Sequence, residues 1–179
     1  MREDIASILL SEEQLHTRVR ELGAEISRDY AGKAPLFVGV LKGCFIFMAD
    51  LFREVTIHGS VDFMAVSSYG NGTSTTGAVK INKDLSQDIE NRDVIIVEDI
   101  LDSGITLSYL TKYLQNRKPS SICIATLLDK PARRRADVQA KYVGFTVPDA
   151  FVVGYGLDYA QKYRNLPYIG VVEFHEDEE

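Results

Sequence analysis

The chain has 179 residues, the length of one domain, and its 45% hydrophobic and 26% charged residues are typical of a globular protein rather than a disordered one. The net charge of −6 argues against a nucleic-acid binder, because such a protein needs a basic face to oppose the phosphate backbone. The longest apolar runs, 35–41 and 94–97, fall far short of the roughly 18 residues that a membrane-spanning helix needs. The acidic start of the chain leads into no long apolar stretch, which argues against a secretory signal.

The cysteines and histidines favour neither disulfide nor metal chemistry. Cys44 and Cys123 lie in apolar stretches, as buried thiols do in a reducing compartment, so we expect a cytoplasmic protein. His16, His58 and His175 are scattered and lack the spacing of metal ligands.

The first predicted element is a helix over residues 11–30. Ser11 and Gln14 form the S-x-x-Q pattern of a capping box, in which each side chain caps the backbone N–H of the other. Apolar residues then recur at three- and four-residue steps, which places them on one face of a helix. They are Leu15, Val19, Leu22 and Ile26. Gly32 marks the expected stop.

The next segments predict a strand, a helix and a pair of strands. Residues 35–41 are continuously apolar, which is typical of a strand buried on both faces, and 44–54 can form a buried helix. Residues 61–66 alternate as a strand, and 78–82 form a returning one. Between them, 70–77 hold only small or polar residues, three of them glycine, so we expect a mobile loop.

The second half of the chain continues the alternation of strands and helices. A helix is expected at about 105–116, and strands are expected at 93–97, 121–128, 151–153 and 168–172. This order predicts an α/β fold with a mostly parallel, twisted sheet flanked by helices. Ligands of such sheets bind beyond the carboxyl ends of the strands. Ligand-binding residues are therefore expected in the segments 41–43, 98–106 and 129–134.

The stretch 94–106 is the most informative part of the sequence. Its β-branched strand delivers Glu98 and Asp99, and the turn Asp102-Ser103-Gly104 then opens a helix. Backbone N–H groups at a helix start, with the Ser103 and Thr106 hydroxyls, form a cradle for an anion, and Gly104 allows close approach of the ligand. The two carboxylates would repel a phosphate, so they suit ribose hydroxyls or a metal ion that holds a pyrophosphate. A purely structural role, with the acids solvated at a strand end and an aspartate capping the helix, would explain the two acids alone. It does not explain the whole arrangement of residues 94–106.

This arrangement resembles the motif that binds 5-phosphoribosyl-1-pyrophosphate (PRPP) in type I phosphoribosyltransferases. Leu41-Lys42-Gly43 resembles the family's pyrophosphate loop, which often contains a non-proline cis peptide, and Ser68-Tyr69-Gly70 resembles the loop that closes over the site. The segments 128–130, 148–159 and 163–167 are similar to the purine-binding end of the hypoxanthine-guanine members. The resemblance runs from about residue 38 to 172.

The resemblance implies an organisation and an activity. The organisation is one phosphoribosyltransferase domain over 1–179, with a core at about 35–145 and a small hood from about 1–15 and 146–175. The activity is purine salvage, in which phosphoribosyl passes from PRPP to hypoxanthine or guanine with Mg²⁺ as cofactor. The implied partners are PRPP and a 6-oxopurine, with no nucleic acid and no membrane, in a homodimer or homotetramer.

Residue roles on the PRPP side follow from the same resemblance. Glu98 and Asp99 would hold the ribose hydroxyls, directly or through Mg²⁺, and Asp158 would be a further metal ligand. Asp102 is the candidate general base near purine N7. The 5′-phosphate would be bound by Asp102, Ser103, Gly104, Ile105 and Thr106. The pyrophosphate would be bound by Leu41, Lys42, Gly43 and Arg164. Some relatives have a lysine where this chain has Ile105, and here the backbone alone would serve.

On the purine side, Lys130 would donate to the 6-oxo group and reject a 6-amino group. Phe151 would stack on the base, with Val152 and Asp158 at its edge, and Ser68 and Tyr69 would belong to the lid. Arg134 matches a family arginine near the pyrophosphate, whereas Arg133 and Arg135 are interpreted as solvated surface.

Two alternative functions remain at this point. A xanthine-preferring phosphoribosyltransferase would use Lys130 equally well. A PRPP-sensing regulator would keep the 94–106 motif but would need a basic nucleic-acid surface or an added DNA-binding domain, and the chain shows neither.

Overall fold

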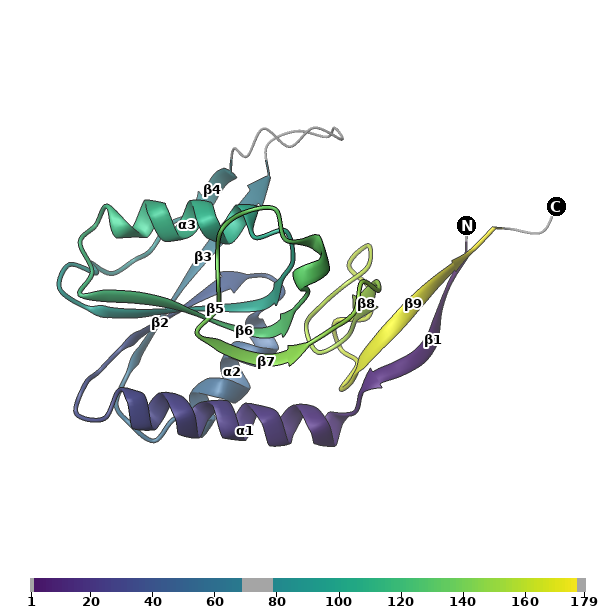
Figure 1. Ribbon diagram of the computed structural model, residues 1–179, viewed down its shortest axis with the longest axis horizontal. Helices are drawn as coiled ribbons and strands as arrows, with labels where there is room; N and C mark the ends of the chain where they lie inside the picture. Colours follow the sequence, from purple (N-terminus) through teal and green to yellow (C-terminus); the bar gives the residue numbers. More distant parts are fainter. Residues whose placement is uncertain (1, 69–78, 177–179) are drawn as a thin grey trace.

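Six strands form the main sheet, in the order β4-β3-β2-β5-β6-β7 (Figure 1). The computed structural model describes residues 2–68 and 79–176. Neighbouring strands are parallel except for β4, which runs antiparallel to β3. The strands are β2 (Leu36–Leu41), β3 (Ser60–Ser68), β4 (Val79–Lys83), β5 (Asp93–Leu101), β6 (Ser121–Asp129) and β7 (Tyr142–Thr146). The expected mostly parallel α/β sheet is confirmed.

Helices cover both faces of this sheet. The helices α1 (Glu12–Asp29) and α2 (Phe45–Glu54) lie on one face, and α3 (Ile105–Gln115) lies on the other (Figure 1). Each face has its own buried apolar cluster, one including Leu22 of α1 and Phe47 of α2, the other including Leu110 of α3. A short 3₁₀ turn, η1 (Pro131–Arg133), follows β6. No helix in the described part of the chain has both the length and the apolar character needed to cross a membrane.

The first helix forms as its sequence predicts. The Ser11 hydroxyl accepts a hydrogen bond from the Gln14 N–H at 3.2 Å, and the Gln14 side chain accepts one from the Ser11 N–H at 2.8 Å. The capping box is therefore present, and it satisfies two backbone donors at the start of the helix. The predicted apolar stripe is buried, with Leu15, Leu22 and Ile26 fully inside.

A second, three-stranded sheet joins the two ends of the chain. It pairs β1 (Arg2–Leu10) with β9 (Ile169–His175) and β9 with β8 (Val152–Val153), all antiparallel. In Figure 1 the N- and C-terminal strands run side by side, away from the main sheet. The division into a core and a hood stays a prediction.

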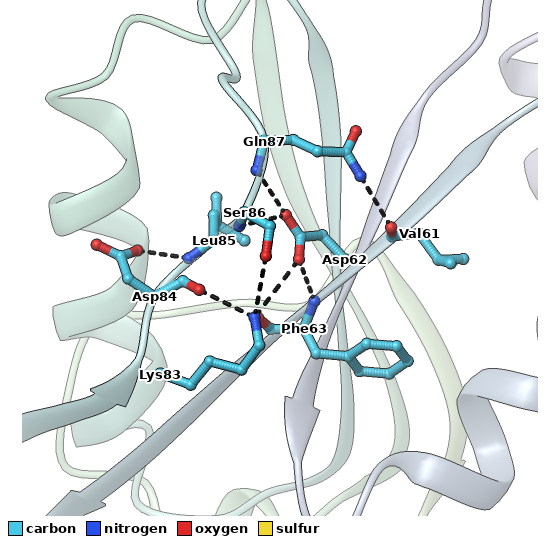
Figure 2. A network of polar contacts seen from close by, with 8 residues as sticks. All are labelled: Val61, Asp62, Phe63, Lys83, Asp84, Leu85, Ser86 and Gln87. Atoms are coloured by element: carbon cyan, nitrogen blue, oxygen red, sulfur yellow. Dashed lines mark hydrogen bonds and ion pairs between the residues drawn. The ribbon is translucent and has the colours of Figure 1, made fainter.

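A polar network joins strand β3 to the segment that follows β4 (Figure 2). The carboxylate of Asp62, 6% exposed, accepts hydrogen bonds from the backbone N–H groups of Ser86 at 2.8 Å and Gln87 at 3.0 Å. Lys83 Nζ lies 3.7 Å from the same carboxylate and donates to the carbonyl of Phe63 at 2.9 Å. The network therefore fixes the base of the β3–β4 hairpin at the edge of the sheet.

The structure differs from the sequence analysis in three strands. Neither β1 nor β7 was predicted. The strand β5 continues through Glu98 and Asp99 to Leu101 instead of ending at the predicted residue 97, because Ile100 still pairs with Leu128 of β6.

The predicted closing loop falls largely outside the described residues. Ser68 is the last residue of β3. Tyr69 and the segment 70–77 are not among the described residues, so the lid assignment stays a prediction.

Candidate active site

Two clefts adjoin one another near the carboxyl ends of the central strands. The first cleft, of about 270 Å³, is lined by Val40, Leu41, Gly43, Val66, Ser67, Glu98, Asp99, Ile100, Leu101, Asp102, Ser103, Gly104, Thr106 and Leu107. The second cleft, of about 280 Å³, is lined by Asp99, Ile100, Asp102, Lys130, Arg133, Ala150, Phe151, Val152, Leu157 and Asp158. Asp99, Ile100 and Asp102 line both clefts, so the two form one composite site with these residues between its halves.

The turn at the start of α3 forms one wall of the first cleft. Gly104 caps the helix in a left-handed conformation, with φ +80°, and a Cβ there would lie 2.4 Å from Val138 Cγ1. Only glycine fits this turn without strain or displacement. Asp102, Ser103 and Thr106 line the cleft beside it, whereas Ile105 does not. The arrangement places a helix N-terminus, which favours anions, at the wall of the cleft.

The two acids of β5 differ in their surroundings. Glu98 is buried, and this burial, followed by the adjacent charge of Asp99, raises the pKa of its carboxyl well above the usual value. Glu98 Oε1 accepts a hydrogen bond from the Asp99 N–H at 3.1 Å, and Asp99 Oδ1 accepts one from the Ile100 N–H at 2.8 Å. Two adjacent carboxyl groups at the end of a strand, one of them buried, suit ligands that bring hydroxyl donors or positive charge.

The loop after β2 packs directly against one of these acids. The Leu41–Lys42 peptide bond is cis, as the resemblance led us to expect. A Cβ on Gly43 would lie 1.9 Å from Asp99 Oδ2, and a Cβ on Gly156 would lie 2.4 Å from the carbonyl oxygen of Gly43. Leu41 and Gly43 line the first cleft, whereas Lys42 is exposed and does not line it.

Asp102 combines a buried oxygen with a central location. Its Oδ1 is buried and has no hydrogen-bond partner among the described residues. Buried polar atoms are almost always paired, so such an atom needs an explanation. Asp102 lines both clefts, so a ligand that spans them would lie beside its side chain.

The second cleft holds a buried lysine and an exposed aromatic ring. Lys130 is 6% exposed, and its Nζ donates to the Ala150 carbonyl at 2.8 Å. Phe151 is 44% exposed, and the adjacent Val152 is buried in β8. The cleft therefore offers a cationic donor, an aromatic face and a strand edge to one ligand.

The loop that follows β8 brings an acid and an arginine together. Arg164 Nη2 lies 3.2 Å from Asp158 Oδ1, and Arg164 Nη1 donates to the Gly156 carbonyl at 2.7 Å. Asp158 lines the second cleft, whereas Arg164 does not line either cleft. Asp158 and Glu98 line different clefts, and the described residues contain no group of three acids, histidines or cysteines that could hold a metal ion.

Two arginines make contacts in this site that the sequence did not predict. Arg133, interpreted as surface, is exposed but lines the second cleft, where it pairs with Asp149 at 2.6 Å. Arg134 forms an ion pair with Asp129 and donates to the carbonyls of Asp102 at 3.1 Å, Val138 at 3.1 Å and Leu101 at 3.4 Å. Its expected location near the pyrophosphate stays a prediction. The sequence held no signal for these backbone contacts.

Known proteins share this sequence and fold. The family model described as "Phosphoribosyl transferase domain" matches residues 6–160. A hypoxanthine-guanine phosphoribosyltransferase of Bacillus subtilis is 57% identical over 97% of this chain and 96% of its own length. The bifunctional protein TilS/HprT of Listeria monocytogenes is 56% identical over 97% of this chain, which corresponds to 27% of that protein. A crystal structure of a hypoxanthine phosphoribosyltransferase from Staphylococcus aureus is 55% identical, covers 95% of this chain and 92% of its own, and superposes with a TM-score of 0.93. This chain belongs to the phosphoribosyltransferase family, among its hypoxanthine-guanine members.

Proposed function

We propose that this protein transfers the 5-phosphoribosyl group of PRPP to hypoxanthine or guanine, giving the nucleoside monophosphate and pyrophosphate. The observation that carries the assignment is the unpartnered Oδ1 of Asp102, between an anion-binding turn and a cleft with a buried lysine. A purine nitrogen attacks C1 of the ribose as the bond from C1 to the pyrophosphate oxygen breaks. Little covalent chemistry falls to the protein, so positioning and charge placement supply most of the catalysis.

In this reaction the first cleft holds PRPP. The turn from Asp102 to Thr106 receives the 5′-phosphate, and Glu98 with Asp99 receives the ribose hydroxyls. The pyrophosphate lies against the loop Leu41-Lys42-Gly43. Arg164 contributes positive charge there after its ion pair with Asp158 breaks. The carboxylate of Asp102 accepts the proton that the purine loses.

In the second cleft, Lys130 selects the base. An ammonium group has three donors and no acceptor, so it matches a 6-oxo oxygen and mismatches a 6-amino group. One of its donors is used on the Ala150 carbonyl, which holds the amine in place. Phe151 offers its exposed ring for stacking, and Val152 presents backbone groups to the edge of the base.

The residues fit Mg²⁺ as the cofactor. Magnesium prefers oxygen ligands and binds through one or two carboxylates together with substrate phosphates and waters. Glu98 and Asp99 in the first cleft and Asp158 in the second supply such carboxylates without forming a closed cage among the described residues. When bound, the ion neutralises charge on the pyrophosphate.

We also propose a homodimer or homotetramer in the cytoplasm, where the free thiols of Cys44 and Cys123 stay reduced.

The test is an assay with PRPP and four separate bases, namely hypoxanthine, guanine, xanthine and adenine. Nucleoside monophosphates are separated by chromatography, in the presence of Mg²⁺ and in excess EDTA. We expect products from hypoxanthine and guanine, none from adenine, and none in EDTA. A dominant product from xanthine would change the substrate assignment, and PRPP binding without turnover of any base would support a regulator.

A further inference from the structure

Three aromatic rings meet at the outer side of the second cleft. They belong to Phe151 before β8, Tyr159 in the loop that carries Asp158, and Phe174 in β9. The ring centroids of Phe151 lie 5.6 Å from Tyr159 and 5.5 Å from Phe174, and those of Tyr159 and Phe174 lie 5.0 Å apart. All three pairs are edge-to-face, with interplanar angles of 87°, 76° and 63°. This is a favourable geometry for aromatic pairs, because the positive edge of one ring meets the negative face of the next.

Only one ring of this trio lines the cleft. Phe151 lines it, whereas Tyr159 and Phe174 do not. Phe151 is 44% exposed, so apolar packing from the core alone does not determine its orientation. The two neighbouring rings limit the rotation of its side chain from outside the cleft.

The strand β9 also holds the backbone of the same residue. The N–H of Val172 donates to the Phe151 carbonyl at 2.9 Å, and Val152 pairs with Val171 in the ladder between β8 and β9. The end of the chain therefore fixes both the main chain and the ring of Phe151.

We propose that Phe174 and Tyr159 are positioning residues that hold the Phe151 ring in the orientation in which it stacks on the purine. The proposal rests on the proposed function, which supplies the purine, and it goes further by making the aromatic residue at the end of β9 a determinant of affinity for the base. We expect the affinity for PRPP to be unchanged when Phe174 is replaced, because Phe174 does not line the first cleft.

The kinetic test compares Phe174→Ala, Phe174→Leu and Phe174→Tyr with wild type. Loss of one aromatic contact predicts a rise in the KM for hypoxanthine of roughly three- to tenfold in Phe174→Ala, with the KM for PRPP unchanged. Phe174→Leu keeps apolar bulk without a ring and should resemble Phe174→Ala, whereas Phe174→Tyr should restore the wild-type KM. The matched control is Ile8→Ala, which removes another exposed apolar side chain of the same sheet, at 59% exposure. An unchanged purine KM in Phe174→Ala, or an equal rise in both KM values, would overturn the proposal.

A second measurement needs no catalysis. The chain contains no tryptophan, so Phe151→Trp introduces a unique fluorophore at the ring in question. Time-resolved anisotropy of this indole should show faster local motion when Phe174→Ala is added, and unchanged motion when Ile8→Ala is added. Identical anisotropy in the three proteins would refute the positioning role. If no base is ribosylated by wild type, the proposed function fails, and this experiment still decides whether the trio holds the ring.

Discussion

The guanidinium of Arg134 donates to the backbone carbonyl of Asp102 at 3.1 Å while it forms an ion pair with Asp129. Asp129 is the last residue of β6 and precedes Lys130, so one side chain joins the turn of the first cleft to the strand that presents the lysine of the second. The relative placement of the candidate base and the candidate purine donor therefore depends on Arg134.

Replacing Arg134 by lysine should disturb both halves of the site. Lysine keeps the charge but cannot reach several acceptors at once, as the fork of arginine does. We expect kcat to fall and the KM for both substrates to rise, with a loss of about 1–3 kcal/mol in the free energy of unfolding. Steady-state kinetics and urea denaturation measure these effects, with the exposed neighbour exchange Arg135→Lys as control. Normal kinetics in a destabilised Arg134→Lys protein would limit Arg134 to a structural role.

Asp102→Asn tests the general base. Asparagine keeps the size of the side chain but has almost no affinity for a proton, so kcat should fall by ~10²–10⁴-fold. The affinity for PRPP, measured by calorimetry, should change little, because the turn backbone is retained. An unchanged kcat would leave Asp102 with a role in the phosphate turn alone.

Lys130→Gln tests recognition of the base. The variant replaces a charge-assisted hydrogen bond by a neutral one, which should lower kcat/KM for hypoxanthine by roughly ten- to hundredfold. The amide of glutamine can still donate to the Ala150 carbonyl, so folding should be largely kept. If titration with PRPP shows an equal loss of affinity, Lys130 faces the phosphates instead.

Gly43→Ala tests the packing between the loop after β2 and Asp99. The added Cβ would lie 1.9 Å from Asp99 Oδ2, so the loop or the carboxylate must move. We expect the KM for PRPP to rise by roughly tenfold or more, equivalent to about 1.4 kcal/mol. The control is Gly32→Ala, where a Cβ meets nothing within 4 Å but φ is +77°. It should cost about 1–2 kcal/mol of stability and leave the KM for PRPP unchanged. If the KM for PRPP were the same in Gly43→Ala and Gly32→Ala, the packing of Gly43 on Asp99 would have no part in PRPP binding.

The thiols should be slow to react at neutral pH. Burial, followed by the nearby charge of Glu98, raises the pKa of the Cys44 thiol, and burial also raises the pKa of Cys123. The thiolate is the reactive form, so a raised pKa lowers its population at pH 8 relative to a free cysteine. Alkylation by iodoacetamide, followed by mass spectrometry, should be slow in the native protein, should accelerate as pH rises, and should modify both residues rapidly in urea. Rapid native labelling of Cys44 at pH 7 would contradict this.

Sequence reasoning succeeded where the determining contacts are local. The capping box of Ser11 and Gln14 and the turn from Asp102 to Thr106 each lie within a few residues, so their patterns can be read directly. The predicted residues lining the two clefts also follow from strand ends, because parallel strands bring their carboxyl ends to one edge of the sheet.

It failed where the partner is distant in the chain. The strand β1 is defined by pairings such as Ile5 with Val172, which no local periodicity reveals. In β7, Gly144 interrupts the strand pattern, yet a Cβ there would lie 2.4 Å from the Leu127 carbonyl, so close packing on β6 requires that glycine. The contact between Phe151 and Phe174 likewise depends on the second sheet.

Because β9 lies late in the chain, the first cleft can form during synthesis before the second sheet can. Chains emerge from the ribosome N-terminus first, so the segments lining the first cleft, within 40–107, are available well before β9. The strand β1 is made before β9 but pairs with it, and Phe151 receives both a ring neighbour and a backbone donor from β9. A nascent chain thus carries the anion-binding turn before it has a finished second cleft. Throughout that interval β1 lacks its hydrogen-bonding neighbour, and an unpaired strand edge of this kind is a surface on which other chains can pair.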